Sequence, residues 1–289
     1  MSTIRYHISR TIARLLPDKI YLGIKFRSRF GYWMDWNNPK TFSEKLQWLK
    51  VYDRHPEYTK MVDKLAAKEY VASVVGEEFI IPTLAVYDSA DEIDFENLPD
   101  QFVLKCTHDS GGLVVCKDKS KFDRDAARRK LRKCLKRSYV IQNREYPYKN
   151  VTRRIIAEKY IEDESGYELK DYKFFCFSGA PRLIQLDFDR FSDHKKNLFS
   201  LDWELLPFSF NYPRHPECIF PKPIGLEKMI ELAKVLSKNI PFVRIDLYNN
   251  NGKIYFGEIT FFPASGLGKF QPVEWDDKLG EWIKLPDKH

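Results

Sequence analysis

The sequence predicts an α+β fold, in which helices and strands occupy separate stretches of the chain. Apolar residues at helical spacing dominate the first sixty residues. Short runs rich in β-branched and aromatic residues begin near residue 80 and fill most of the chain after residue 150. The 289 residues suffice for one large domain or two to three small ones, and a hydrophobic content of 43% excludes a disordered chain.

The N-terminal stretch predicts a basic amphipathic helix within residues 1–30. Seven basic residues accompany one acid there, and apolar residues recur at helical spacing: Ile4, Ile8, Ile12, Leu15 and Leu16. The expected role is a terminal helix that packs on the domain with its basic face in water. Peripheral contact with a membrane surface is the alternative. A second helix is expected over 41–50, capped by Thr41 or Ser43, and a third over 63–75.

The middle of the chain changes to a mixed pattern. Strands are expected over 80–87, 101–106 and 113–116, where β-rich runs are bounded by turn-forming residues. A helix is then expected over 119–137, in which ten basic residues face two acids. We interpret these charges as a solvated helix face and expect no nucleic-acid partner, because no aromatic-interleaved basic motif accompanies them.

The C-terminal half predicts a largely antiparallel sheet with one helix. The helix is expected over 226–238, and residues 249–252 (NNNG) are a hairpin-turn signal. The strands are expected over 155–161, 171–177, 181–188, 197–201, 243–248 and 254–261. We therefore divide the chain into a helical region, 1–60, and two α+β units, 61–150 and 151–289.

The composition predicts the cellular compartment of the protein and the charge of its partners. No apolar run approaches the roughly 20 residues that span a bilayer, and no secretion signal is visible, so we expect a cytoplasmic protein. The five cysteines contain no CxxC pair, which argues against a zinc ribbon and fits a reducing compartment. The net charge of +7 favours an anionic partner.

A strand that ends in Lys105 leads into a small polar loop over 107–112. Backbone N–H groups of such a loop can approach a polyphosphate while the lysine neutralises its charge. The residues that suit this approach are Ser110, Gly111 and Gly112. His108 could also contact a phosphate, but we expect it to be a solvent-exposed loop histidine. The segment is not a Walker loop, since no GK[ST] follows, and an ordinary hairpin is the alternative.

Two further segments carry groups that suit a nucleotide. Lys64 lies at the expected start of a helix, where an ordinary surface lysine is the alternative. Near residue 158 a strand emerges into polar residues, and the exposed backbone of its edge could pair with an adenine. An ordinary edge strand is the alternative there. The residues at that end are Glu158, Lys159, Tyr160 and Ile161.

Two C-terminal strands each carry an acid among apolar residues. Arg244 and Asp246 share a face of one strand, and Glu258 and Thr260 share a face of the next. Such carboxylates are costly to bury without a cation, and oxygen ligands from only two carboxylates are typical of a magnesium–nucleotide site. A structural ion pair between Arg244 and Glu258 is the alternative.

The order of these four segments resembles the ATP-grasp superfamily over residues 60–268. Within it the chain is most similar to the teichuronopeptide-biosynthesis branch, also called TupA-like, through TFSEKL at 41–46, DYKF at 171–174 and GEITF at 257–261. The resemblance implies an ATP-grasp fold, in which two α+β subdomains clasp ATP. A short helical N-terminal region would replace the usual α/β pre-domain.

The resemblance also implies how the nucleotide would be bound. Lys64 and Lys105 would contact the phosphates, and the loop over 107–112 would close over them. The backbone of 158–161 would bind adenine. Lys173 would be a further contact to the nucleotide or the substrate, and other substrate candidates stand at neighbouring strand ends: Asp187, Asp189 and Arg190.

The reacting centre is implied in the same way. Arg244 would face the reacting phosphoryl and acyl oxygens, and Asp246 and Glu258 would bind Mg²⁺. Thr260 stands where the superfamily usually has an asparagine, so the implied metal set departs from the usual one at this position.

The implied activity is an ATP-dependent carboxylate–amine ligase that forms an amide through an acyl phosphate, with ATP and Mg²⁺ as cofactors. The branch suggests that an amino acid or other amine is joined to a uronic-acid carboxylate in capsule or cell-surface polysaccharide biosynthesis, in the cytoplasm near the inner face of the membrane. Such chemistry needs no protein nucleophile. A glycosyltransferase of the same pathway and a non-catalytic nucleotide-binding module are the alternatives.

Overall fold

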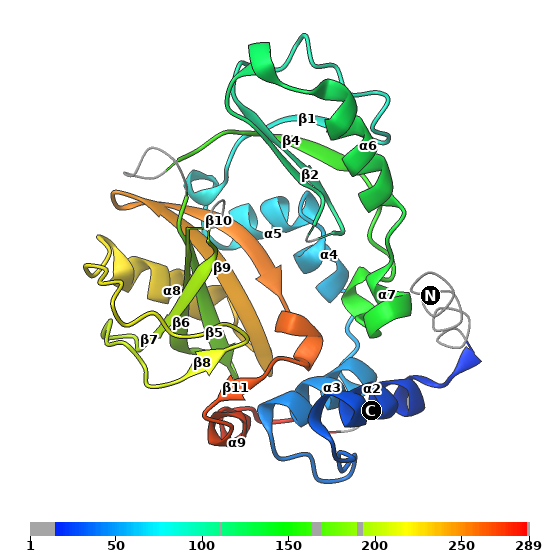
Figure 1. Ribbon diagram of the computed structural model, residues 1–289, viewed down its shortest axis with the longest axis vertical. Helices are drawn as coiled ribbons and strands as arrows, with labels where there is room; N and C mark the ends of the chain where they lie inside the picture. Colours follow the sequence, from blue (N-terminus) through cyan, green and yellow to red (C-terminus); the bar gives the residue numbers. More distant parts are fainter. Residues whose placement is uncertain (1–14, 110, 163–168, 190–192, 288–289) are drawn as a thin grey trace.

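The computed structural model describes residues 15–109, 111–162, 169–189 and 193–287 (Figure 1). Within these ranges two main antiparallel sheets are combined with surrounding helices, which confirms the predicted α+β class. No helix in the same ranges is both long and apolar enough to cross a bilayer. Several residues named above lie outside the described part: Ile4, Ile8, Ile12, Ser110 and Arg190.

Within the described residues, four α-helices precede the first strand: α2 (Asp18–Phe30), α3 (Phe42–Tyr52), α4 (Tyr58–Val62) and α5 (Ala66–Val75). Thr41 caps α3, as expected. Its hydroxyl accepts a hydrogen bond from the N–H of Glu44 at 3.1 Å, and the Glu44 carboxylate accepts one from the N–H of Thr41. The third predicted helix begins at Ala66 instead of Asp63, because the Asp63 carboxylate accepts the N–H of Leu65 at 2.9 Å from outside the helix.

The smaller sheet has the strand order β1-β4-β2-β3, and every neighbouring pair is antiparallel. Its strands are β1 (Thr83–Tyr87), β2 (Phe102–Cys106), β3 (Leu113–Cys116) and β4 (Ile155–Lys159). The helix α6 (Arg124–Leu135) covers one face, where Leu104, Leu131 and Ala157 are fully buried. β4 lies after residue 150, the predicted boundary between the two α+β units, yet it pairs within the smaller sheet. The smaller sheet therefore contains residues from both predicted units.

The basic helix α6 is shorter than the predicted span of 119–137. A 3₁₀ turn, Lys119–Lys121, comes first, and Asp123 then caps α6 by accepting the N–H of Ala126 at 2.8 Å. Leu131 and Cys134 face the core, whereas Arg129 and Lys133 are exposed. This is the arrangement expected of a solvated basic face.

The larger sheet has the order β10-β9-β5-β6-β7 and is also antiparallel throughout. Its strands are β5 (Asp171–Phe177), β6 (Ala180–Phe188), β7 (Lys195–Phe199), β9 (Phe242–Asn250) and β10 (Lys253–Thr260). The helix α8 (Leu226–Leu236) packs on one face, where Cys176 Sγ lies 3.8 Å from the carbonyl oxygen of Ala233. Alternation along the strands turns Lys173 and its cross-strand partner Asp246 to the other face. Figure 1 shows the smaller sheet above the larger one, with α4 and α5 between them.

The C-terminal residues return to the N-terminal helices. A two-stranded sheet pairs β8 (Ser209–Phe210) with β11 (Phe270–Gln271), and α9 (Glu274–Glu281) follows. Helix α9 packs on α3, because the Asp276 carboxylate accepts the N–H of Ser43 at 2.8 Å and Lys45 donates to the carbonyl of Gly280 at 2.9 Å. A Cβ at Gly280 would come within 2.1 Å of the Lys40 carbonyl, so this approach requires glycine. These contacts, together with α7 (Tyr139–Asn143), are absent from the sequence prediction.

The contact between α9 and α3 predicts a pH-dependent stability. Burial raises the pKa of Asp276 to about 6, against the hydrogen bonds from Ser43, which lower it. The folded state therefore binds this proton more tightly than the unfolded state, and the stability it contributes is lost as the pH rises from about 4 to 6. Asp276→Asn keeps an acceptor for Ser43 without a charge. Relative to the parent, its free energy of unfolding should rise by about 2 kcal/mol between pH 4.5 and 7, measured by urea denaturation.

The matched control is Glu274→Gln, which changes an exposed acid on the same helix. Its unfolding free energy should follow the parent across the same pH range. Parallel pH profiles for Asp276→Asn and the parent would contradict the assignment.

Candidate functional site

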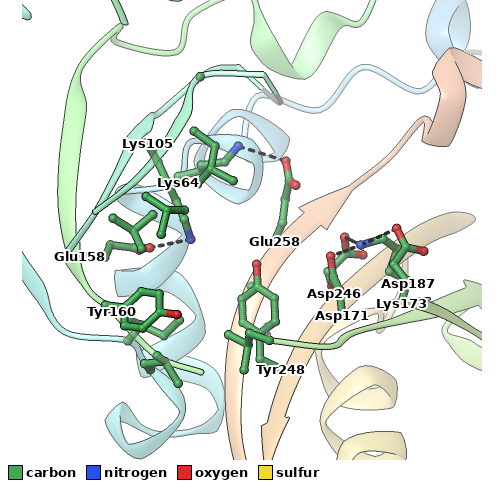
Figure 2. Close-up of a pocket in the computed structure, with 18 of the residues that line it drawn as sticks. Lys64, Lys105, Glu158, Tyr160, Asp171, Lys173, Asp187, Asp246, Tyr248 and Glu258 are labelled. Atoms are coloured by element: carbon green, nitrogen blue, oxygen red, sulfur yellow. Dashed lines mark hydrogen bonds and ion pairs between the residues drawn. The ribbon is translucent and has the colours of Figure 1, made fainter. Parts of the chain in front are cut away.

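A cavity of about 570 Å³ lies between the two sheets and is lined from both of them. It brings together residues from all four segments singled out in the sequence. From the first three come Lys64, Lys105, Gly112, Glu158, Lys159, Tyr160 and Ile161, and from the larger sheet come Asp171, Lys173, Asp187, Arg244, Asp246 and Glu258. Figure 2 shows the labelled side chains of the two groups facing each other across the cavity.

The cavity has an apolar part along the smaller sheet. Val103 and Val115 are cross-strand partners of β2 and β3, and they line it together with Ile81, Leu113 and Ile161. β4 ends at Lys159, so the backbone of the next two residues runs past the sheet along this lining. A flat aromatic ring could pack on these side chains while its polar edge meets the backbone.

Two lysines share the carboxylate of Glu158 at the inner end of this surface. Lys105 Nζ lies 2.6 Å from Glu158 Oε2, and Lys68 contacts Oε1. Lys68 is itself held in place, because it donates to the Ile81 carbonyl and to the Thr83 hydroxyl at 2.8 Å each. Glu158 is only 3% exposed. The resemblance assigns a backbone role to this residue, and the structure adds an ion-pair role for its side chain.

The pKa values follow from this burial and pairing. Burial raises the pKa of the Glu158 carboxyl, but Lys105 and Lys68 more than offset the effect and hold the pKa below its usual value. Burial lowers the pKa of Lys105, whereas Glu158 and Tyr248 raise it above its usual value. Lys105 therefore remains a cation at neutral pH, as a phosphate contact requires.

The hairpin of β9 and β10 places each predicted pair of residues on one face of its strand. Glu258 stands opposite Asp246, and Thr260 stands opposite Arg244. Arg244 donates to both oxygens of Asp246 at 2.7 Å and to the Thr260 hydroxyl at 3.2 Å. Glu258 is paired with Lys64, whose Nζ lies 3.2 Å from Oε1. The structure therefore has an Arg244–Asp246 pair and a Lys64–Glu258 pair in place of the alternative Arg244–Glu258 pair.

A β-bulge at Gly257 sets the position of Glu258. The register shifts between Phe256 and Glu258, and a Cβ at Gly257 would lie 3.0 Å from the Asp246 carbonyl and from the ring of Tyr248. Burial raises the pKa of the Glu258 carboxyl, but Lys64 and Arg244 lower it by more, so it lies below its usual value. Glu258 is therefore ionised at neutral pH.

Asp246 and Glu258 have the donor chemistry for a magnesium ion. They are carboxylates on adjacent strands in direct register, and Mg²⁺ commonly takes one or two carboxylates and completes its shell with water and phosphate. Among the described residues, no group of three or more His, Cys, Asp or Glu is arranged to hold a metal by itself. Thr260 is not one of the residues that line the cavity, and its hydroxyl accepts from Arg244.

Lys173 stands at the centre of a cluster of carboxylates on the larger sheet. It forms a salt bridge with Asp171, and its Nζ lies 3.4 Å from Asp246 and 3.7 Å from Asp187. Burial lowers the pKa of Lys173, but the three aspartates raise it above its usual value. Lys173 therefore holds Asp246 and Asp187 in place as well as lining the cavity.

The glycine loop differs from the expectation in one respect. His108, expected to be exposed, is buried at 3% exposure and does not line the cavity. The reason is that Thr107 anchors the loop: its N–H donates to the carbonyl of Arg154 at 2.9 Å, and its carbonyl accepts the N–H of Lys64 at 3.0 Å. The burial lowers the pKa of His108.

The two described glycine positions of the loop are crowded. A Cβ at Gly112 would lie 2.7 Å from Cys106, and one at Gly111 would lie 2.5 Å from Nη1 of Arg137. Gly112 lines the cavity and Gly111 does not. A Cβ at Gly112 would also lie 3.2 Å from Cβ of Cys134 on α6, so close packing between β2 and α6 is one physical reason for glycine at position 112.

The lining or supporting residues that were not singled out from the sequence include Lys68, His194, Lys196 and Tyr212. Lys68 follows Lys64 by four residues, and this spacing is the only local signal for it. His194 and Lys196 reach the cavity through the pairing of β7 with β6. Tyr212 follows β8, whose pairing with β11 joins segments about sixty residues apart. Asp189, a predicted substrate candidate, does not line the cavity.

No curated protein sequence matches the chain. Among solved structures, it is similar to the D-alanine–D-alanine ligase from Bacillus anthracis complexed with ATP, at 14% identity over 78% of this chain and 68% of that chain, with a TM-score of 0.38. The D-alanine–D-alanine ligase from Helicobacter pylori has 16% identity, coverage of 84% and 69%, and a TM-score of 0.40. The VanG D-Ala:D-Ser ligase from Enterococcus faecalis has 12% identity, coverage of 75% and 53%, and a TM-score of 0.42. Likenesses of this size assign no substrate.

A family model described as TupA-like ATPgrasp matches residues 44–284. The match spans both sheets and every segment that contributes to the cavity. The chain therefore belongs to the TupA-like ATP-grasp family.

Proposed function

We propose that the protein is an ATP-dependent carboxylate–amine ligase. ATP would phosphorylate a carboxylate, and an amine would then displace phosphate from the acyl phosphate and leave an amide. One observation carries the proposal. Two lysines, an arginine and two carboxylates from distant parts of the chain line a single cavity: Lys64, Lys105, Arg244, Asp246 and Glu258. The five cysteines do not line that cavity, in keeping with a reaction that needs no protein thiol.

Each group has a part in this scheme. Adenine would pack on the apolar surface of Val103 and Val115, with its polar edge at the backbone after β4. Lys64 and Lys105 would neutralise the phosphates, and Arg244 would stabilise the charge that develops on the transferring phosphoryl group.

Asp246 and Glu258 would hold Mg²⁺. The metal, when bound, supplies a positive charge that offsets the phosphate oxygens. Lys173 would keep Asp246 oriented through its 3.4 Å contact, and Arg244 would do so through two hydrogen bonds of 2.7 Å.

We further propose that the carboxylate belongs to a uronic acid and that the amine is an amino acid or a related compound, in capsule or other cell-surface polysaccharide biosynthesis in the cytoplasm. The family and the net charge of +7 support an acidic, carbohydrate-derived substrate. Release of ADP in a screen of uronic acids against amino acids tests this assignment. Transfer from a UDP-sugar without ATP would favour a glycosyltransferase.

Nucleotide binding gives the first prediction for the site. MgATP should raise the melting temperature, because a ligand that binds only the folded state stabilises it by about 2.7 kcal/mol at a hundred times its Kd. Lys105→Ala should lose most of this shift, measured by differential scanning fluorimetry against its own ligand-free protein. The control is Lys121→Ala, a change on the exposed 3₁₀ turn. A shift with UDP-sugars but not with MgATP would contradict the proposal.

The carboxylate and the arginine of the hairpin give the second prediction. Glu258→Gln removes the charge that matters most as the phosphoryl group moves, so the rate of ADP release should fall about a hundredfold or more while the affinity for ATP falls less. Arg244→Lys should also reduce kcat more than it raises the KM for ATP.

Glu231→Gln changes an exposed acid on α8 and serves as the control for the hairpin variants. It should keep the parent rate. We would abandon the ligase proposal if folded Glu258→Gln and Arg244→Lys released ADP and formed amide as fast as the parent.

We also propose that the α2 region contacts an anionic membrane surface. Ile20, Ile24 and Trp33 are exposed, and Arg27 lies 5.1 Å from the ring centroid of Trp33, so apolar and basic groups share one surface. The full chain should sediment with phosphatidylglycerol vesicles and not with phosphatidylcholine vesicles, and Ile24→Glu should weaken the binding. Val74→Glu, an exposed position on α5, is the control. Equal retention of Ile24→Glu and the parent would contradict the proposal.

A further inference from the structure

The end of the cavity at β7 is built from residues that have no part in the proposed nucleotide site. Lys196 lies on β7, His194 directly precedes that strand, and Tyr212 follows β8. All three line the cavity together with Asp187. Because nothing in the nucleotide chemistry uses them, they are available to another part of the substrate.

A line of ionic contacts joins this end to the carboxylates of the hairpin. Lys173 Nζ lies 3.4 Å from Asp246 and 3.7 Å from Asp187 Oδ2, and Lys196 Nζ lies 3.8 Å from the same Asp187 oxygen. The strand register places these groups on one face, since Lys196 stands opposite Asp187 and Lys173 stands opposite Asp246. β9 and β7 are three strand spacings apart, or about 14 Å.

Both carboxylate oxygens of Asp187 already have partners. Its Oδ1 accepts from the Gln185 amide at 2.6 Å, and its Oδ2 is shared by Lys173, Lys196 and by His194 at 3.2 Å. One carboxylate therefore serves several cationic or protonatable groups.

Lys196 differs from the other buried or half-buried cations of the cavity. Lys64, Lys105, Lys173 and Arg244 each have a carboxylate oxygen within 3.2 Å. Among the described residues, the Lys196 ammonium has only its looser contact with Asp187 and a position 4.2 Å from the ring centroid of Tyr212. Its side chain is 18% exposed, so its N–H donors can be reached by a ligand.

We propose that Lys196, assisted by His194, binds a second anionic group of the acid substrate, whose reacting carboxylate lies beside Arg244. The inference rests on the proposed ligase function. It limits the acid substrate to compounds with two negative groups, one placed at Arg244 on β9 and the other at Lys196 on β7. The second group is a carboxylate of a neighbouring sugar acid in an oligomer, or a phosphate on a single sugar acid. Both are anions that an ammonium and an imidazole can hold by charge-assisted hydrogen bonds.

The test is calorimetric titration of the MgADP-loaded protein with three probes: galacturonate, digalacturonate and galacturonate 1-phosphate. At least one doubly charged probe should bind about tenfold more tightly than galacturonate. Lys196→Met should abolish this preference without changing the Kd for galacturonate, and Lys196→Arg should retain it. The matched control is Lys195→Met, because the adjacent lysine pairs with Asp189 and Asp193 and does not line the cavity.

The outcomes separate the two sources of charge. A preference for digalacturonate identifies the second group as a carboxylate, and a preference for the sugar phosphate identifies it as a phosphate. The proposal is overturned if no doubly charged probe binds more tightly than galacturonate, or if folded Lys196→Met keeps the preference. Failure of the ligase function would show separately, as tight binding of a doubly charged probe without ADP release from ATP in the presence of any amine.

Discussion

The larger sheet turns a face of charged side chains towards the cavity, and the site depends on how that face is neutralised. Asp171, Asp187 and Asp246 are all buried, and an unpaired carboxylate in such a place would be strongly destabilising. Lys173 contacts all three from the middle of the sheet. It converts three mutually repelling acids into a connected network, and this network fixes Asp246, one of the two carboxylates that we propose as metal ligands.

The two proposed metal ligands are supported to different degrees. Among the described residues, Asp246 is held by two hydrogen bonds from Arg244 and by Lys173, whereas Glu258 has one ion-pair partner, Lys64, and a side chain that is 23% exposed. In the proposed ligase, Asp246 would therefore fix the position of the metal, and Glu258, with fewer contacts to break, would complete its shell.

The part of the site that the sequence predicted is the part that local patterns determine. The alternation of apolar and polar residues around a hairpin-turn signal places Arg244 with Asp246 and Glu258 with Thr260, and the register confirms both faces. The order of the segments, through the family resemblance, predicted that Lys64 and Lys105 would meet them. Residue types and spacing along the chain carry this information, so it is available without a structure.

What the sequence did not predict depends on contacts between distant segments. Lys68 becomes part of the site because β4 delivers Glu158 to it, and Lys196 does so because β7 pairs with β6. His108 was expected in solvent because its neighbours are small and polar, yet the anchoring of Thr107 to Arg154 turns it inwards. Partners more than forty residues away decide the positions of Lys68 and His108, and no local pattern records those contacts. Lys196 was missed although its cross-strand partner Asp187 is only nine residues away, because nothing in the sequence marked the pairing of β6 with β7.

Lys64 and Lys68 are four residues apart and hold different sheets. Lys68 contacts Glu158 of the smaller sheet, and Lys64 contacts Glu258 of the larger one. Any motion that widens the space between the sheets must therefore stretch one of the two contacts, and the more exposed Lys64–Glu258 pair is the weaker. In the proposed ligase, a cation bound at Glu258 would remove the same tie. Metal binding and separation of the two sheets would then be thermodynamically linked through this short stretch of chain.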